Sequence, residues 1–228
     1  MNRSNFYSTT NPESFYCRIM LPKAVKIKDA LIVTKGAMKS MGMLAYQEEI
    51  WEELLDGRVV AMSPRPAVNH NVVAENIIRI FGNYLEGKPC RVFGEIDVYL
   101  TEKDRVIPDA IIVCNNDIIR KNGVYGAPDL IVEVLSPGTA AKDKGYKRKL
   151  YEKCGVREYW LVDTDSCSIE VHLLHEGRFE LDDVYSVYPD YLLEKMTEEE
   201  KNNITYTFKT SLFSDMSIEL EKVFQGML

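Results

Sequence analysis

The chain has 228 residues, of which 46% are hydrophobic and 28% charged, and its net charge is −7 at pH 7. This composition is typical of a globular protein of one or two domains, and the acidic balance argues against broad, non-specific affinity for nucleic acid. Neither a run of about 18 apolar residues nor a basic-then-apolar N-terminus occurs, so we expect no transmembrane helix and no secretory signal, and a cytoplasmic location.

The cysteines indicate a reducing compartment. There are five, and none belongs to a CxxC pair: Cys17, Cys90, Cys114, Cys154 and Cys167. An odd count without such pairs favours free thiols and argues against a zinc site.

The first part of the chain divides into an extension and the start of a compact pattern. Residues 1–44 are predicted to be an N-terminal arm, and the domain is predicted to span residues 45–228. Residues 46–55 look helical up to an Asp56-Gly57 turn, and residues 58–63 form a short strand. Next comes an amphipathic helix over residues 68–86, because its apolar side chains recur at helical spacing.

The middle of the chain has the pattern of a sheet. Alternation predicts a strand over residues 90–100, in which Glu95 faces away from the apolar side. Residues 107–114 and 128–135 are near-continuous apolar runs, typical of central strands covered on both faces, and residues 115–126 read as a loop.

The remaining elements are helices and strands in alternation. They are a helix over 142–154, strands over 158–162, 168–174 and 205–209, and a last helix over 216–224. This order predicts an α/β fold with a sheet between helices.

Two acids interrupt the central apolar runs, Asp109 and Glu133. A buried acid is costly unless it is paired or bound to metal. Asp129 shares a strand face with Glu133 but lies roughly 13 Å away, too far to share an ion, and is assigned to a turn or cap. If the strands of Asp109 and Glu133 are neighbours, their carboxylates converge and suit Mg²⁺ with a substrate phosphate. The alternative for Asp109 is a solvated turn acid after Pro108.

Lys147 lies one helical turn after Asp143 and one before Tyr151, so the three share a helix face. Without further information, a salt bridge on a solvated surface is the simpler interpretation.

These segments, IPDAIIV, GAPDLIVEVLSPGT and KDKGYKRKLYEKCGVREYWLVD, resemble the Uma2 family of the PD-(D/E)XK nuclease superfamily. The likeness covers about residues 45–225. It implies a restriction-endonuclease-like core, with a central mixed β-sheet flanked by helices.

The resemblance also assigns roles. Asp109 matches the PD aspartate and Glu133 the second metal-binding acid, for Mg²⁺ or alternatively Mn²⁺. Leu135 stands where the pattern has its lysine and cannot serve. Lys147 occupies the place of a helix lysine that the family shows instead, and would stabilise charge and position the attacking water.

Supporting roles fall to residues around these three. Asp143 or Tyr151 would orient Lys147, and Glu53 matches a helix acid that completes such sites. His70 also matches, although a core histidine is the simpler account. Ser136 would bond the acids or cap the following helix, and Glu95 would line the site or face solvent.

The resemblance implies a Mg²⁺-dependent endonuclease that acts on DNA, with a homodimer as the arrangement that cuts both strands. The rival hypothesis is a catalytically inactive nuclease-fold protein that serves as a binding or assembly module. The acidic net charge and Leu135 favour the rival.

Overall fold

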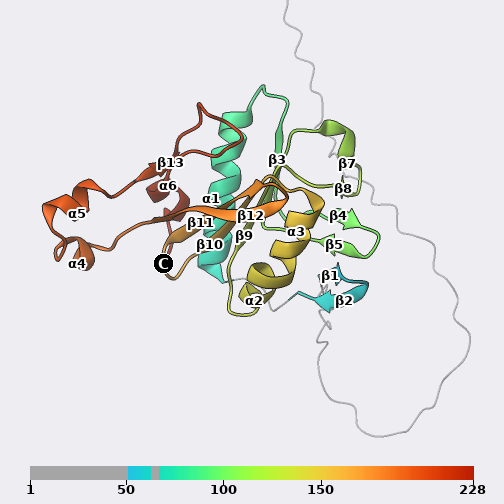
Figure 1. Ribbon diagram of the computed structural model, residues 1–228, viewed down its shortest axis with the longest axis horizontal. Helices are drawn as coiled ribbons and strands as arrows, with labels where there is room; N and C mark the ends of the chain where they lie inside the picture. The colour runs from blue at the N-terminus through green and yellow to red at the C-terminus, as the bar shows by residue number, and fades with distance from the viewer. Residues whose placement is uncertain (1–50, 63–66) are drawn as a thin grey trace, which may run out of the picture. The chain divides into compact units, whose positions relative to one another are not determined.

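Two six-stranded sheets carry the fold in the computed structural model, which describes residues 51–62 and 67–228 (Figure 1). The central sheet has the order β12-β11-β10-β9-β6-β3. Its strands are β3 (Arg91–Phe93), β6 (Ala110–Val113), β9 (Leu130–Val134), β10 (Glu158–Asp163), β11 (Ser168–His175) and β12 (Arg178–Ser186). It is a mixed sheet, because β9 and β10 are parallel whereas the other neighbours are antiparallel.

The second sheet is built from shorter strands in the order β2-β1-β5-β4-β8-β7. They are β1 (Glu52–Leu55), β2 (Arg58–Ala61), β4 (Val98–Thr101), β5 (Asp104–Val106), β7 (Ile119–Arg120) and β8 (Gly123–Tyr125). A 3-10 turn, η1 (Asn116–Ile118), precedes β7.

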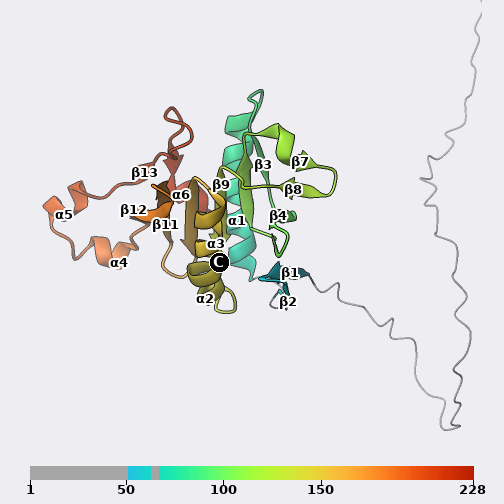
Figure 2. The same cartoon turned by 45° about the vertical axis from the view of Figure 1, so that its right-hand side comes forward.

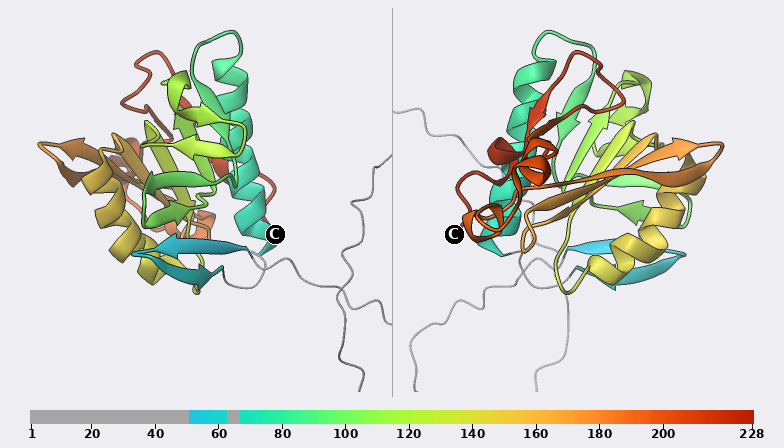
Figure 3. Two further views of the ribbon diagram at one scale, coloured as in Figure 1. Left: turned by 90° about the vertical axis from the view of Figure 1, so that its right-hand side faces the viewer. Right: turned by 60° about the vertical axis from the view of Figure 1, so that its left-hand side comes forward.

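Helices cover both faces of the central sheet (Figure 3). The long helix α1 (Val68–Leu85) lies on one side with α6 (Leu220–Phe224). On the other side lies a continuous helical segment of three parts, α2 (Ala140–Lys142), the π-helix η2 (Asp143–Lys147) and α3 (Arg148–Cys154). Two short helices, α4 (Asp190–Leu193) and α5 (Glu198–Asn202), lie in the connection from β12 to the hairpin of β13 (Thr207–Phe208) and β14 (Ile218–Glu219) (Figure 2). This architecture confirms the predicted fold class.

Strand alternation divides the interior into two cores. Leu130, Val132 and Val134 of β9 face α1 and α6, whereas Ile131 faces α3 and the second sheet. Since side chains two apart point the same way, Glu133 lies on the face of Ile131. An acid is thus buried in the layer between the central sheet, α3 and the second sheet.

The predicted helix over residues 46–55 is wrong where the structure describes it. Residues 52–55 form β1, which pairs with β2 through a tight turn at Asp56 and Gly57. Both turn residues have positive φ, 49° and 72°, the conformation of a two-residue hairpin turn. Residues 52–55 are therefore one strand of a hairpin and not part of a helix. Residues 46–50 lie outside the described part, as does Ser63 of the predicted 58–63 strand.

The single strand predicted over residues 90–100 is also wrong. The chain leaves the central sheet after β3 and enters the second sheet at β4. At the break, Gly94 lies so close to Ile78 Cδ1 that a Cβ would collide with it, and Glu95 has a φ of 48°. The alternation of apolar residues continues across this break and hides it.

Other predictions hold to different degrees. The helix over 68–86, the two central strands, the helix over 142–154 and the strands at 158–162 and 168–174 are confirmed, with Gly155 in the left-handed conformation at the C-cap of α3. The predicted loop over residues 115–126 contains the β7–β8 hairpin, and the expected helix over 216–224 is shortened to α6. The sequence did not predict β12.

Cys90 and Cys114 form a disulfide, so the prediction of free thiols is wrong for this pair. They flank β3 and β6, where the register Arg91↔Val113 places them opposite each other with their Cα atoms 4.0 Å apart. Cys154 and Cys167 are free, and Cys17 lies outside the described residues. None of the helices in residues 51–62 and 67–228 is both long and apolar enough to cross a membrane.

Candidate active site

Asp109 and Glu133 face each other across two neighbouring strands. β6 and β9 are antiparallel with Ala110 opposite Val132, and the same register places Asp109 opposite Glu133. Residues directly opposite on an antiparallel pair have Cβ atoms about 4.5–5.5 Å apart. Asp109 Oδ2 accepts a hydrogen bond from the Val134 N–H at 2.6 Å, which holds this carboxylate at the end of the sheet.

Glu133 is buried and strongly bonded through one oxygen. Its Oε1 accepts hydrogen bonds from the Tyr151 hydroxyl at 2.6 Å and from the Lys147 ammonium at 3.2 Å. Burial raises the pKa of Glu133 well above its usual value; Lys147 opposes the rise, and the nearby acids Asp143, Asp109 and Glu53 add to it.

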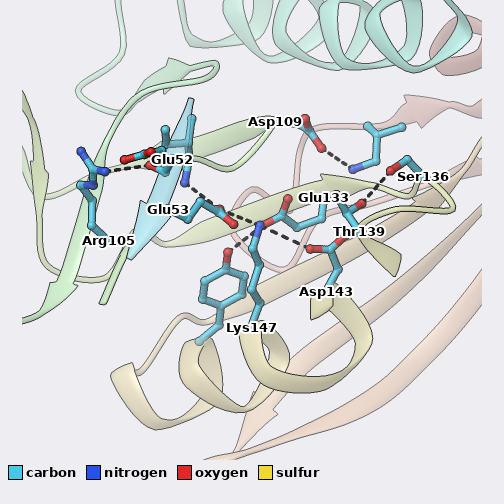
Figure 4. A network of polar contacts seen from close by, with 12 residues as sticks. Glu52, Glu53, Arg105, Asp109, Glu133, Ser136, Thr139, Asp143 and Lys147 are labelled. Atoms are coloured by element: carbon cyan, nitrogen blue, oxygen red, sulfur yellow. Dashed lines mark hydrogen bonds and ion pairs between the residues drawn. The ribbon is translucent and has the colours of Figure 1, made fainter. Parts of the chain in front are cut away.

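The Lys147 ammonium lies among three carboxylates (Figure 4). Its Nζ is 2.8 Å from Glu53 Oε1, 3.2 Å from Glu133 Oε1 and 3.3 Å from Asp143 Oδ1. The residue is only 3% exposed, so the interpretation as a surface salt bridge is wrong. Burial alone lowers the pKa of Lys147, but the three acids outweigh it and the net pKa is raised, which keeps the ammonium charged.

The π-helix η2 carries two members of this cluster, Asp143 and Lys147. Both are buried, as are Leu150 and Tyr151 in the next turns, so one face of η2 and α3 points into the sheet. The Tyr159 hydroxyl of β10 donates to the Asp143 carbonyl at 3.2 Å. Single π turns inside helices occur frequently at functional sites.

Glu53 reaches the cluster from the second sheet. It lies on strand β1, so the prediction that it is a helix acid is wrong, although its side chain does lie at the site. Its Oε1 also accepts the Ile107 N–H at 3.1 Å. Glu53 therefore ties the second sheet to the helical segment through Lys147.

His70 of α1 lies next to Asp109. Its Nε2 is 3.5 Å from Asp109 Oδ1, and its buried Nδ1 has no hydrogen-bond partner within the described residues. Burial alone lowers the pKa of His70, but Asp109, together with the backbone of Val134 and the side chain of Asn71, opposes this and the net pKa is raised. His70 was predicted either to belong to the site or to be a core histidine. The structure gives it a direct contact with Asp109, a candidate metal ligand.

The other predicted supporting residues differ in whether they contact the site. Tyr151 bonds Glu133 and not Lys147, whereas Asp143 does contact Lys147. Ser136 Oγ lies 3.0 Å from Thr139 Oγ1 at the start of the helical segment and bonds neither site acid in the described part of the chain. Glu95 is exposed and lines a pocket beside the site.

The sequence interpretation did not predict the contact that Tyr159 makes at the site. Tyr159 is buried, and its hydroxyl holds the backbone of the π-helix. The available signal was its place on β10: it lies opposite Ile131 and two residues before Leu161, the partner of Glu133. Asp129 accepts the Cys114 N–H at 2.7 Å, in agreement with a capping role.

Residues 43–198 match the family model of Uma2, whose description is "Putative restriction endonuclease". The chain belongs to the Uma2 family. A protein of Synechocystis sp. (strain ATCC 27184 / PCC 6803 / Kazusa), described as uncharacterized, is 32% identical over 129 residues, or 55% of this chain and 66% of that protein. The match thus spans slightly less than two thirds of that relative.

A solved structure shares the fold of this Uma2 protein. It is a protein of Anabaena variabilis ATCC 29413 described as "a putative nuclease belonging to DUF820", with a TM-score of 0.58 at 19% sequence identity. The likeness covers 76% of this chain and 89% of the other. The family resemblance predicted from the sequence is confirmed.

The donor set of this Uma2 protein fits a divalent cation that brings its own waters. No group of three or more His, Cys, Asp and Glu side chains in the described ranges could enclose a metal ion. Mg²⁺, however, is commonly held by one or two carboxylates together with water and substrate phosphate. Asp109 Oδ1 has His70 Nε2 beside it at 3.5 Å, and Glu133 Oε2 accepts no hydrogen bond within the described residues. Glu133 Oε2 is thus free to bind an ion, whereas an ion at Asp109 Oδ1 would replace the contact with His70.

Proposed function

We propose that this Uma2 protein is a Mg²⁺-dependent endonuclease that hydrolyses phosphodiester bonds of DNA. The observation that carries the proposal is the cross-strand pair of Asp109 and Glu133, with the Lys147 ammonium bonded to Glu133. The family description and the fold of the DUF820 protein agree with nuclease chemistry.

The charge of the site supports the need for a cation. The carboxylates of Glu53, Glu133 and Asp143 contact one ammonium, and Asp109 adds a fourth negative charge that acts on Glu133. A phosphodiester is itself an anion and would be repelled by this surplus of negative charge. Asp109 and Glu133 would hold Mg²⁺, which when bound neutralises charge on the phosphate and activates water.

The remaining residues position and stabilise. Lys147 is fixed by three acids and presents a permanent positive charge beside Glu133, where negative charge develops during attack on phosphorus. Tyr151 holds the same Glu133 oxygen, which leaves the other oxygen for the ion. His70 orients Asp109 from the opposite side.

A non-catalytic binding or assembly module is the second candidate. Leu135, at the position of the missing motif lysine, packs against the core between the central sheet and α3. Lys147 is almost completely buried, so the acid cluster could also serve stability alone. A fold alone does not establish an activity.

Nicking of supercoiled plasmid DNA distinguishes the two candidates. We expect nicking with Mg²⁺, none with EDTA, and a loss of roughly 100-fold or more in Glu133→Gln, because several kcal/mol of charge stabilisation depend on the ion. Glu219→Gln removes an exposed acid that pairs with Lys222 and is the matched control. Nicking by neither protein would favour the binding module, and equal nicking by both would overturn the role of Glu133.

A further inference from the structure

A pocket of about 640 Å³ lies beside the candidate active site on the second sheet. Four segments line it. They are Trp51 just before β1, the end of β3 and its connection to β4 with Phe93 and Glu95, the end of β5 with Ile107 after it, and the β7–β8 turn with Lys121 and Asn122. None of these side chains belongs to the acid cluster around Lys147.

Two backbone contacts join the pocket to the acid cluster. Ile107 lines the pocket and donates its N–H to Glu53 Oε1 at 3.1 Å. Glu95 also lines it and donates its N–H to the carbonyl of Pro108, the residue before Asp109, at 3.2 Å. Because Ile107 and Asp109 are two residues apart, their Cα atoms lie within roughly 7.6 Å. The pocket wall at Ile107 and the candidate metal ligand Asp109 therefore belong to one short segment of the chain.

The lining combines aromatic, basic and acidic groups. Trp51 is 46% exposed, an unusual position for an indole, and Phe93 is half-buried. Lys121 and Asn122 are exposed in the β7–β8 turn. Nucleobases stack on aromatic faces while cations follow the phosphates, and carboxylate or amide groups bond the edges of bases.

The backbone at Glu95 is a second sign of a ligand site. Its φ is 48°, in the left-handed region that disfavours side chains. The other non-glycine residues with positive φ among those described, Asp56, Cys167 and Glu176, all lie in turns between adjacent antiparallel strands. Glu95 instead joins two sheets at the pocket wall, and strain of this kind concentrates at ligand clamps.

We propose that the pocket binds one unpaired nucleotide of the strand that the site cleaves, with its base against Trp51. The inference rests on the proposed function, because a phosphodiester substrate is what brings a base to this place. Lys121 faces the backbone of that strand, and Glu95 and Asn122 bond the edge of the base.

Tryptophan fluorescence reports on the pocket directly. The chain has two tryptophans, and Trp160 is fully buried, so a stacked base quenches Trp51. The full chain with Glu133→Gln is titrated with a short single-stranded DNA of mixed sequence, and separately with an abasic strand of equal length. We expect saturable quenching by the first and none by the second.

Fluorescence anisotropy of labelled strands measures the contribution of the ring. Trp51→Ala should weaken binding about tenfold, the loss typical of one stacked base, and Trp51→Phe should restore most of it. Tyr191→Ala removes another exposed aromatic ring, on α4, and should bind like the parent. No binding, binding without quenching, or equal quenching by the abasic strand would overturn the proposal that the pocket binds a base.

The two proposals fail in different ways. Plasmid nicking by the wild type, with Trp51 emission unchanged by DNA, would overturn nucleotide binding in the pocket and leave the proposed function intact. Quenching by base-containing DNA in a protein that never nicks would support binding of a base at Trp51 and overturn the proposed function.

Discussion

Lys147 is the residue on which the acid cluster depends. In Lys147→Met, Glu53, Glu133 and Asp143 lose their common partner, and a buried pair broken on one side typically costs about 3–5 kcal/mol. We expect a loss of that order in the free energy of unfolding from urea titration at pH 7. The loss should shrink as pH falls, because Glu133 has a raised pKa and its protonation removes surplus negative charge.

The matched control is Lys201→Met, which removes one partner of an exposed pair with Glu198. Its unfolding free energy should change little. If Lys147→Met costs less than about 1 kcal/mol, or if its loss does not depend on pH, the cluster is not held by the ammonium.

His70 reports on Asp109. In metal-free buffer the pKa of His70 should lie above its usual 6.5, because Asp109, together with Val134 and Asn71, offsets the effect of burial. A raised pKa in the folded state stabilises the protein below pH 6.5, and this contribution is lost as pH rises through the folded pKa. In Asp109→Asn the charge of the carboxylate is lost, so the pKa of His70 should fall relative to the wild type.

NMR titration can follow His70, because the chain has three histidines and the others, His172 and His175, lie on β11. His172 is the internal control: its pKa is lowered, first by burial, and should not respond to Asp109→Asn. A His70 pKa that is the same in both proteins would contradict the contact.

At the scale of elements, the connection between β3 and β4 lies between the pocket and the candidate active site, because Glu95 lines the pocket and bonds the Pro108 carbonyl. Gly94→Ala places a Cβ against Ile78 Cδ1 and 3.3 Å from the carbonyl of Asp109. Such overpacking typically costs about 1–3 kcal/mol, and it should also reduce nicking because Asp109 moves. Gly145→Ala is the matched control: its Cβ meets nothing within 4 Å, and alanine is favoured over glycine in helices.

Thermal and urea unfolding of the two variants measure this difference. Gly94→Ala should be less stable than the wild type, and Gly145→Ala equal or more stable. Equal stability of both variants would show that the break accommodates a side chain and does not fix Asp109.

Periodicity predicted the elements that stand on a single, regular pattern. α1, β9 and α3 follow from spacing because each buries one continuous face or run. β1 was missed because EELL suits a helix until its antiparallel partner and turn are known. The 90–100 segment alternates without interruption, so only the strand pairings show that the chain changes sheets.

The candidate site was predictable up to the contacts between distant segments. Strand spacing suggested that Asp109 and Glu133 converge if their strands are neighbours, and β6 and β9 are neighbours. The burial of Lys147 could not be derived, because it depends on Glu53 arriving from the second sheet. The Cys90–Cys114 disulfide likewise depends on the pairing of β3 with β6.

For the whole molecule, a net charge of −7 has to be reconciled with an anionic substrate. Without a divalent ion the acid cluster repels the scissile phosphodiester, so cleavage should require one. Active sites on two copies would cut opposite strands, and a homodimer stays a prediction that analytical ultracentrifugation can test.

The most direct test of the account is a crystal structure of the full chain soaked with Mn²⁺ and measured at the manganese absorption edge. We predict an anomalous peak between Asp109 and Glu133, within roughly 2.0–2.6 Å of an oxygen from each carboxylate, and no peak in Glu133→Gln. A map without a peak at these two residues, or with the same peak in Glu133→Gln, would contradict the proposed metal site.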